Sequence, residues 1–308
     1  MDRYNHLNKY LKAKYGERVL KICIDGDFSC PNRDGICGYG GCIFCGHAGS
    51  GENIKYKMSN TLASIQNQIQ CFLDSYRGQR ANKFIAYFQN HTNTYDTISA
   101  LKARYDTALS CSKKIIGLQV ATRPDCINEE VVKLLKSYLD KYSVVVELGL
   151  QTSSDNIGKF INRGYSTKDF INAVELLHKN DIEVVAHIMV GLPNETIDDI
   201  YDTIDLINKV KVDGIKIHST YIISDTELAN LYTQKLYIPI NQEYYVDTIC
   251  EIIARLNSTI VIHRINADPP KDVFIAPDWM LHKKLVLNAI NRELNNRNIY
   301  QGCKYSQK

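Results

Sequence analysis

The sequence has no long apolar segment. Its longest apolar runs, such as 182–193, are interrupted by charged or polar side chains and fall short of the roughly 18 residues that a membrane-spanning helix needs. Residues 1–21 contain no apolar stretch of the kind found in secretory signals. We therefore expect no contact with a membrane and a cytoplasmic location.

Low-complexity segments are also missing, and no internal repeat is visible beyond an alternation of strands and helices. Hydrophobic residues make up 44% of the 308 residues and charged residues 23%, which excludes an intrinsically disordered chain. A chain of this length can form one large domain with an appendage, and it can bury a sizeable core.

The net charge is only +3, but it is unevenly distributed. Residues 1–21 carry a net +4 and residues 281–308 a net +5, which leaves −6 for the rest of the chain. If the two basic ends meet in space, they can bind an anionic polymer. The alternative is that both ends are solvated amphipathic helices.

Apolar strand patterns alternate with helical patterns of 10–15 residues, which is typical of βα units around a parallel sheet. We predict a partial (β/α)6 TIM-like barrel at 19–256, a basic N-terminal helix at 1–18 and a C-terminal extension at 257–308. Functional residues of such barrels lie at the carboxyl ends of the strands. The predicted strands cover 19–24, 84–88, 115–121, 144–150, 183–190, 214–218 and 259–264.

Four of the ten cysteines, Cys30, Cys37, Cys42 and Cys45, lie in a glycine-rich loop after the first predicted strand. Three thiolates can hold a cubane iron–sulfur cluster and leave its fourth iron open to another ligand. The alternative is a structural zinc site with four thiolates, although no second C-x-x-C motif completes a zinc ribbon. A disulfide or inert thiols are further alternatives.

The run CPNRDG…GGCIFC…GSGE, together with AYFQNHTNTY, ATRPDC, VELGLQ, NRGYS, HIMVGLPNET and ADPP…IAPDW, resembles the radical S-adenosylmethionine (SAM) superfamily. More closely it resembles the YtqA/MnmL-like branch, related to the elongator catalytic subunit and to coproporphyrinogen dehydrogenase. The resemblance implies that Cys30, Cys42 and Cys45, spaced C-x11-C-x2-C, bind a [4Fe–4S] cluster that chelates SAM. It leaves Cys37 as a bystander.

The same resemblance implies a set of SAM-binding residues. Phe44 is expected beside the adenine, with simple packing under the loop as the alternative. Glu147 is either a cofactor contact or a buried charge with a partner inside the barrel, and His187 is a ribose contact or a histidine satisfied within the sheet. The full expected set is Phe44, Gln89, Asn90, His91, Thr92, Arg123, Glu147, Gln151, Arg163, His187, Gly191 and Pro193.

Candidate catalytic and substrate-contacting residues are those expected to face the lumen late in the barrel: His218, Tyr221, Arg264 and Asp268. The resemblance implies tRNA as the partner, with the C5 side chain of the wobble uridine trimmed from carboxymethylaminomethyl to aminomethyl. It also implies an electron donor such as flavodoxin or ferredoxin. The alternatives are a radical SAM enzyme acting on a small metabolite or peptide, and a non-enzymatic zinc module that binds RNA.

Overall fold

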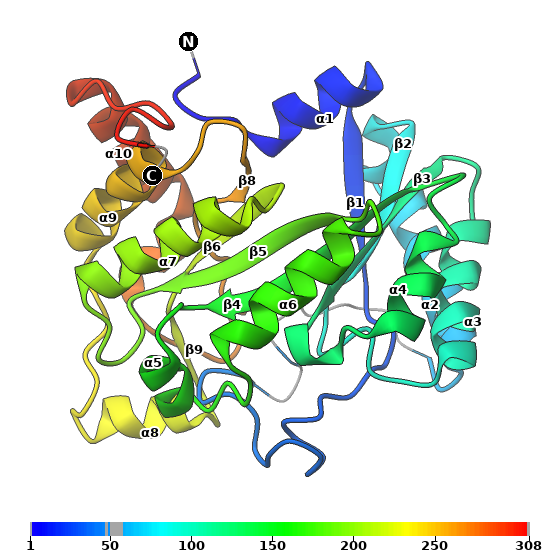
Figure 1. The fold of residues 1–308 in the computed structure, drawn as a ribbon, viewed down its shortest axis with the longest axis horizontal. Coiled ribbons are helices and arrows are strands. Elements are labelled where there is room, and N and C mark those ends of the chain that lie inside the picture. Colours follow the sequence, from blue (N-terminus) through cyan, green and yellow to red (C-terminus); the bar gives the residue numbers. More distant parts are fainter. Residues whose placement is uncertain (1, 47–48, 50–57, 307–308) are drawn as a thin grey trace.

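The computed structural model describes residues 2–46, 49 and 58–306, and its main feature is a curled sheet of seven parallel strands (Figure 1). The strands follow one another in chain order, so each neighbouring pair is joined by a crossover connection. They are β1 (Val19–Ile24), β2 (Lys83–Phe88), β3 (Ile115–Thr122), β4 (Ser143–Gln151), β5 (Glu183–Val190), β6 (Gly214–Ser219) and β8 (Val261–Arg264). The predicted partial barrel is confirmed.

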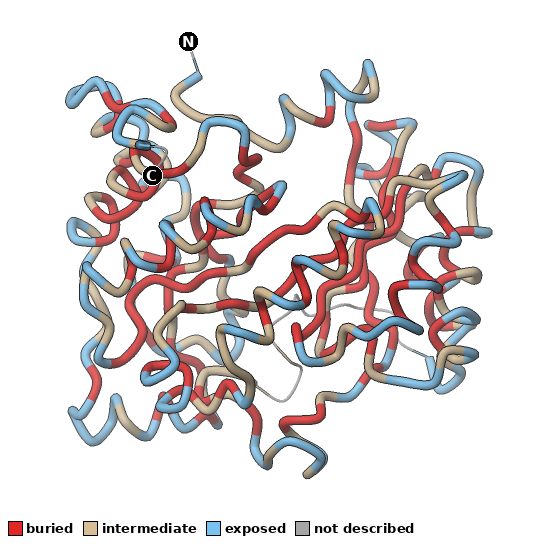
Figure 2. Tube along the Cα trace, viewed as in Figure 1, coloured by how far each residue is buried: buried red, intermediate tan, exposed pale blue. Residues whose placement is uncertain are grey.

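The helices after the first lie outside the curled sheet, most of them against its outer face and the others against a neighbouring helix or the short strand pair. They are α2 (Thr61–Asp74), α3 (Ile98–Ser110), α4 (Glu129–Lys136), α5 (Asp155–Phe160), α6 (Thr167–His178), α7 (Ile197–Val210), α8 (Glu227–Thr233), α9 (Gln242–Arg255) and α10 (Lys283–Asn296). The strands are buried, and the helices bury only their inner stripes (Figure 2). Asn128 caps α4, since its side chain accepts a hydrogen bond from the amide of Val131. None of the helices in the described ranges has the length and apolar character needed to cross a membrane.

The sheet extends beyond the boundary predicted at residue 256. Strand β8 pairs in parallel with β6, so the barrel has seven strands instead of six, and the predicted C-terminal extension supplies the last one. A short antiparallel pair, β7 (Ile222–Ile223) with β9 (Phe274–Ala276), lies after β6. The strand itself was predicted at 259–264, but the boundary at 256 separated it from the sheet to which it belongs.

The N-terminal segment spans the open side of the half-barrel. The amide of Ile262 in β8 donates to the carbonyl of Asn5 at 2.8 Å, and His6 then caps α1 (Leu7–Tyr15). Helix α1 packs on both β8 and β1, the two outermost strands. This extended pairing explains why α1 covers only Leu7–Tyr15 of the helix predicted at 1–18.

The two ends of the chain meet. The carbonyl of Arg3 accepts a hydrogen bond from the amide of Gln301 at 2.8 Å, and the Arg3 guanidinium donates to Asn295 and Asn298. Both ends lie on the same side of the molecule, next to α10 (Figure 1). The two basic ends of the chain therefore meet in space, as a combined basic surface requires.

Candidate functional site

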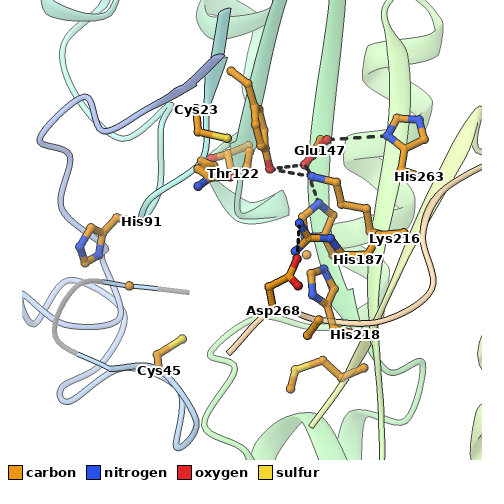
Figure 3. Close-up of a pocket in the computed structure, with 18 of the residues that line it drawn as sticks. Cys23, Cys45, His91, Thr122, Glu147, His187, Lys216, His218, His263 and Asp268 are labelled. Carbon is orange, nitrogen blue, oxygen red and sulfur yellow. Dashed lines mark hydrogen bonds and ion pairs between the residues drawn. The ribbon is translucent and has the colours of Figure 1, made fainter. Parts of the chain in front are cut away.

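A pocket of about 350 Å³ runs along the inside of the curled sheet. Leu7 and Leu11 of α1 line it at the amino ends of the strands, and Cys30, Cys42 and Cys45 line it at the carboxyl ends. In the close-up, Cys45 and His91 lie on one side of this space, and Glu147, Lys216 and His218 lie on the other (Figure 3). The three predicted cluster ligands thus share one cavity.

The cysteine loop is held by its own backbone and by Arg33. The amide of Cys45 donates to the carbonyl of Cys42 at 3.0 Å, and Arg33 Nη2 donates to the carbonyls of Cys45 and Gly46 at 2.8 and 2.6 Å. Gly41 has a φ of +80°, and a Cβ there would lie 2.9 Å from Arg33 Nε. A side chain at this position would both strain the backbone and displace the arginine that fixes the loop.

The three thiols fit a [4Fe–4S] cluster. The thiol of Cys45 donates to the sulfur of Cys42, which lowers the pKa of Cys42 and raises that of Cys45, so the two sulfurs lie within direct contact. Cys37 is exposed and does not line the pocket, and its sulfur lies 3.9 Å from Asp125 Oδ2. This arrangement suits a cluster with three cysteine ligands better than a four-cysteine zinc site.

Most of the expected SAM-binding residues line this pocket: Phe44, Gln89, His91, Thr92, Arg123, Glu147, Gln151 and His187. Within the described part of the chain, Gln89 Nε2 is buried without a hydrogen-bond partner, which is the mark of a group that awaits a ligand. Arg123 makes two hydrogen bonds to Asp125, at 2.9 and 2.7 Å, so its charge is already partly compensated. Residues 50–52 of the GSGE motif lie outside the described residues.

Three other expected contacts do not line this pocket. Asn90 is 2% exposed, and its amide donates to Asp25 Oδ2 at 2.8 Å. Gly191 and Pro193 line a separate, shallower pocket with Ile240. A Cβ at Gly191 would lie 2.8 Å from Ile240 Cδ1, so a glycine is needed here for Ile240 to pack against the backbone. The structure argues against direct contacts from these residues to a ligand in the lumen.

Arg163 also lies outside the lining of the large pocket, because protein groups take up its whole guanidinium. It is fully buried, and its Nη1 donates to the carbonyls of Leu150 and Thr152 at 2.8 and 2.7 Å. Its Nη2 donates to Asp155 at 2.8 Å. The two carbonyls flank Gln151, which lines the pocket with a φ of +66°. Arg163 is therefore placed to position Gln151, and its contact with SAM stays a prediction.

We expect Arg163→Lys to destabilise the fold, because a lysine cannot reach all of these carbonyls. Each buried group left without a partner costs about 1–3 kcal/mol, so thermal unfolding should show a clearly lower Tm. Lys159→Ala, an exposed site on α5, is the control and should leave the Tm unchanged. If SAM affinity falls in Arg163→Lys while the Tm stays constant, Arg163 contacts the cofactor directly.

One polar side chain from each strand points into the lumen, and together these form what we call the lumen layer. Its members are Lys21 (β1), Tyr87 (β2), Gln119 (β3), Glu147 (β4), His187 (β5), Lys216 (β6) and His263 (β8). Glu147 is 1% exposed and stands at the centre. This favours the buried-charge alternative for Glu147, with its partners inside the barrel.

The contacts to the Glu147 carboxylate come from all sides. Its Oε2 lies 2.5 Å from both Lys216 Nζ and the Tyr87 hydroxyl, and 2.7 Å from His187 Nε2. Its Oε1 lies 3.3 Å from Lys21 Nζ and also accepts a hydrogen bond from Gln119. Figure 3 shows several of these groups converging on the carboxylate. A buried carboxylate with this many donors is fully satisfied.

The charges in the lumen layer determine its titration. Burial opposes the ionisation of Glu147, but Lys216, Lys21 and His187 outweigh it and hold the pKa of Glu147 well below its usual range. Burial lowers the pKa of Lys216 to about 7, since the single carboxylate only partly offsets desolvation and the repulsion from Lys21 and Arg264. Burial likewise places the pKa of His218 well below its usual value. Near neutral pH the layer therefore holds one carboxylate and a partly protonated lysine.

The predicted substrate contacts also line the pocket: His218, Tyr221, Arg264 and Asp268. The ring of His218 lies 5.2 Å from that of His187, and its Nε2 is buried without a partner among the described residues. Asp268 pairs with Arg264 at 3.4 Å and with Lys283 at 2.6 Å. These side chains are brought together at the late strands of the barrel, as the sequence indicated.

Sequence reasoning missed Lys21, Tyr87, Lys216, His263 and Tyr165, all of which line the pocket. The ring of Tyr165 lies 4.8 Å from the Arg123 guanidinium and 4.9 Å from that of Arg163. A partial signal was present for Lys21 and Lys216, because a lysine inside a mostly apolar strand needs a buried partner.

Comparison with known proteins agrees with this geometry. A family model described as the radical SAM superfamily matches residues 35–207, and one described as a radical SAM C-terminal domain matches residues 212–296. The YtqA protein of Bacillus subtilis (strain 168) is 34% identical over 97% of this chain and 92% of its own length.

A second relative covers only part of this chain. The protein named tRNA uridine(34) acetyltransferase from Methanocaldococcus jannaschii is 28% identical over 53% of this chain and 30% of its own length. Among solved structures, Elp3 of Methanocaldococcus infernus matches with a TM-score of 0.67 at 18% identity, over 92% of this chain and 64% of that one. At this identity the structural likeness establishes the fold.

Proposed function

The chain belongs to the radical SAM superfamily, and we propose that it acts on the C5 side chain of the tRNA wobble uridine and converts carboxymethylaminomethyl to aminomethyl. The C–N bond to the carboxymethyl carbon would break, water would be consumed and the two-carbon unit would leave as glyoxylate, while the two electrons lost from that carbon would reduce SAM to methionine and 5′-deoxyadenosine. Cys30, Cys42 and Cys45 would hold the [4Fe–4S] cluster. When bound, the cluster supplies one electron that cleaves SAM into methionine and a 5′-deoxyadenosyl radical. The observation that carries the chemistry is that the three cysteines share one walled cavity with the strand-end residues.

The protein's own contribution is enclosure and orientation. The curled sheet surrounds the pocket and α1 covers its far end, which excludes water from a reactive radical. The unpartnered amide nitrogen of Gln89 and the ring nitrogen of His218 supply hydrogen-bonding groups within this enclosure. A substrate C–H group held there has a fixed position relative to the cofactor.

Two observations support tRNA as the substrate. One relative carries a tRNA uridine(34) activity in its name, and this chain spans about a third of that protein. The two basic chain ends meet, and Lys12, Arg18 and Lys284 are exposed and form no ion pair among the described residues. Lysine and arginine side chains on such a surface bind a phosphate backbone. A low-potential donor such as flavodoxin or ferredoxin would supply the electron.

The test is the wobble-uridine profile of a strain that lacks the gene. We expect its tRNA, digested and analysed by mass spectrometry, to accumulate carboxymethylaminomethyl uridine and to lose the aminomethyl form. Wild-type protein supplied from a plasmid should restore the profile, and Cys42→Ala should not. An unchanged profile would refute the tRNA substrate and favour a small metabolite or a peptide, while leaving the cluster chemistry intact.

A further inference from the structure

The lumen layer carries more positive than negative charge. Lys21 and Lys216 both form an ion pair with the single carboxylate of Glu147. Arg264, the next cation along the lumen, has only Asp268, which it shares with Lys283. Among the described residues that line the pocket, Glu147 and Asp268 are the only carboxylates. Lys21 and Lys216 thus share Glu147, and Arg264 and Lys283 share Asp268, so a further small anion beside the three of these cations that line the pocket would improve the charge balance.

The cations are accessible from the cavity. Side-chain exposure is 16% for Lys21, 10% for Lys216 and 31% for Arg264, and all three line the pocket. His218, with its unpartnered Nε2, lines the same space. A ligand that pairs with these side chains would therefore approach them from the lumen and not from bulk solvent.

We propose that the lumen layer binds a carboxylate of the substrate between Lys216, Lys21 and Arg264. The substrate's identity rests on the function proposed above, in which the uridine side chain ends in a carboxylate. Leu7 and Leu11 of α1 line the same pocket as Lys21 at the amino ends of the strands, a position that suits the end of a side chain. A backbone phosphodiester, which continues on both sides, does not fit this position. Recognition of the carboxylate would also explain why the trimmed product is released.

The experiment compares two anticodon stem–loop RNAs that differ only in the wobble side chain, one carboxymethylaminomethyl and one aminomethyl. Their affinities for the cluster-loaded protein with SAM are measured by fluorescence anisotropy under anaerobic conditions. We expect wild type to prefer the carboxylate-bearing RNA by about 10- to 100-fold, the strength of a hydrogen bond to a charged group. Lys216→Met should lose this preference, and its affinity for the aminomethyl RNA should stay the same.

Two further variants keep the result interpretable. Lys14→Met removes a lysine that pairs with Glu183 at 2.5 Å outside the pocket, and its preference should match wild type. Arg264→Gln changes a more exposed member of the site and should reduce the preference if Lys216→Met does not fold. Equal affinity of wild type for both RNAs, or an unchanged preference in both lumen variants, would overturn the proposal even if the enzyme trims tRNA.

A small-molecule arm separates this inference from the proposed function. N-methylglycine carries the amine and carboxylate of the uridine side chain, and N-methylethanolamine carries a hydroxyl in place of the carboxylate. We expect N-methylglycine alone to shift the side-chain NMR signals of Lys216 and His218. If tRNA proves not to be a substrate, this shift still supports a carboxylate site. Inorganic phosphate that shifts the signals equally well would overturn the assignment to a carboxylate.

Discussion

The Cys42→Ala variant is expected to purify without its iron–sulfur cluster and to form no 5′-deoxyadenosine from SAM under strong reductant. Cys42 lines the pocket with Cys30 and Cys45, and a cluster with an open iron needs all three thiolates. The thiol of Cys45 donates to the sulfur of Cys42, so these two sulfurs lie within direct contact. Iron content, the absorbance near 400 nm and 5′-deoxyadenosine formation check this expectation.

Cys37→Ala is the matched control, since Cys37 lies in the same loop but is exposed and faces Asp125. It should retain about four irons per chain and the full rate of SAM cleavage. If Cys37→Ala loses its metal as completely as Cys42→Ala, the four-cysteine zinc alternative regains its support. If Cys42→Ala still cleaves SAM, the assignment of the cluster ligands is wrong.

The position of the site could be predicted from the sequence because parallel strands bring their carboxyl ends to one edge. Gln89, Arg123, Gln151 and His218 are far apart in the chain, yet each follows or ends a strand, and all line one pocket. The strand pattern alone placed these ends together. Spacing relative to known families predicts that Arg163 contacts SAM, but it could not show that the Arg163 guanidinium donates to the backbone on both sides of Gln151.

The lumen layer was not predictable in the same way. Period-two patterning shows which residues share a face of a strand, but both faces of these strands are buried, so it does not distinguish the lumen from the helix side. Lys21 and Lys216 are nearly 200 positions apart, and only the curl of the sheet brings both to Glu147. Similarly, β8 was assigned to an appendage because a four-residue strand has too little pattern to show that it completes the sheet.

The Glu147→Gln variant is expected to be destabilised by about 3–5 kcal/mol, the usual result of removing one partner from a buried ion pair. Glutamine keeps the size of the side chain but removes the charge that compensates Lys216 and Lys21. It also replaces one acceptor oxygen by a donor that faces the Tyr87 hydroxyl or His187. Chemical denaturation measures this loss, and Lys216→Met in the same background should recover part of it, because the uncompensated ammonium is then gone.

The pH dependence gives this prediction a second readout. The folded pKa of Lys216 is about 7 and its unfolded value is about 10.4, so between these pH values the unfolded chain binds the extra proton and stability rises with pH. Glu147 titrates in the acid range, since its folded pKa is depressed, and its contribution is lost only as the pH falls below its unfolded value. Above pH 7 Lys216 is increasingly neutral and needs its counter-ion less, so the cost of Glu147→Gln should be larger at pH 6 than at pH 9.

Glu183→Gln is the control. It removes a half-exposed carboxylate paired with Lys14 and should lower the free energy of unfolding by less than about 1 kcal/mol at both pH values. If both variants lose the same free energy of unfolding at every pH, the Glu147 carboxylate does not compensate the positive charges around it.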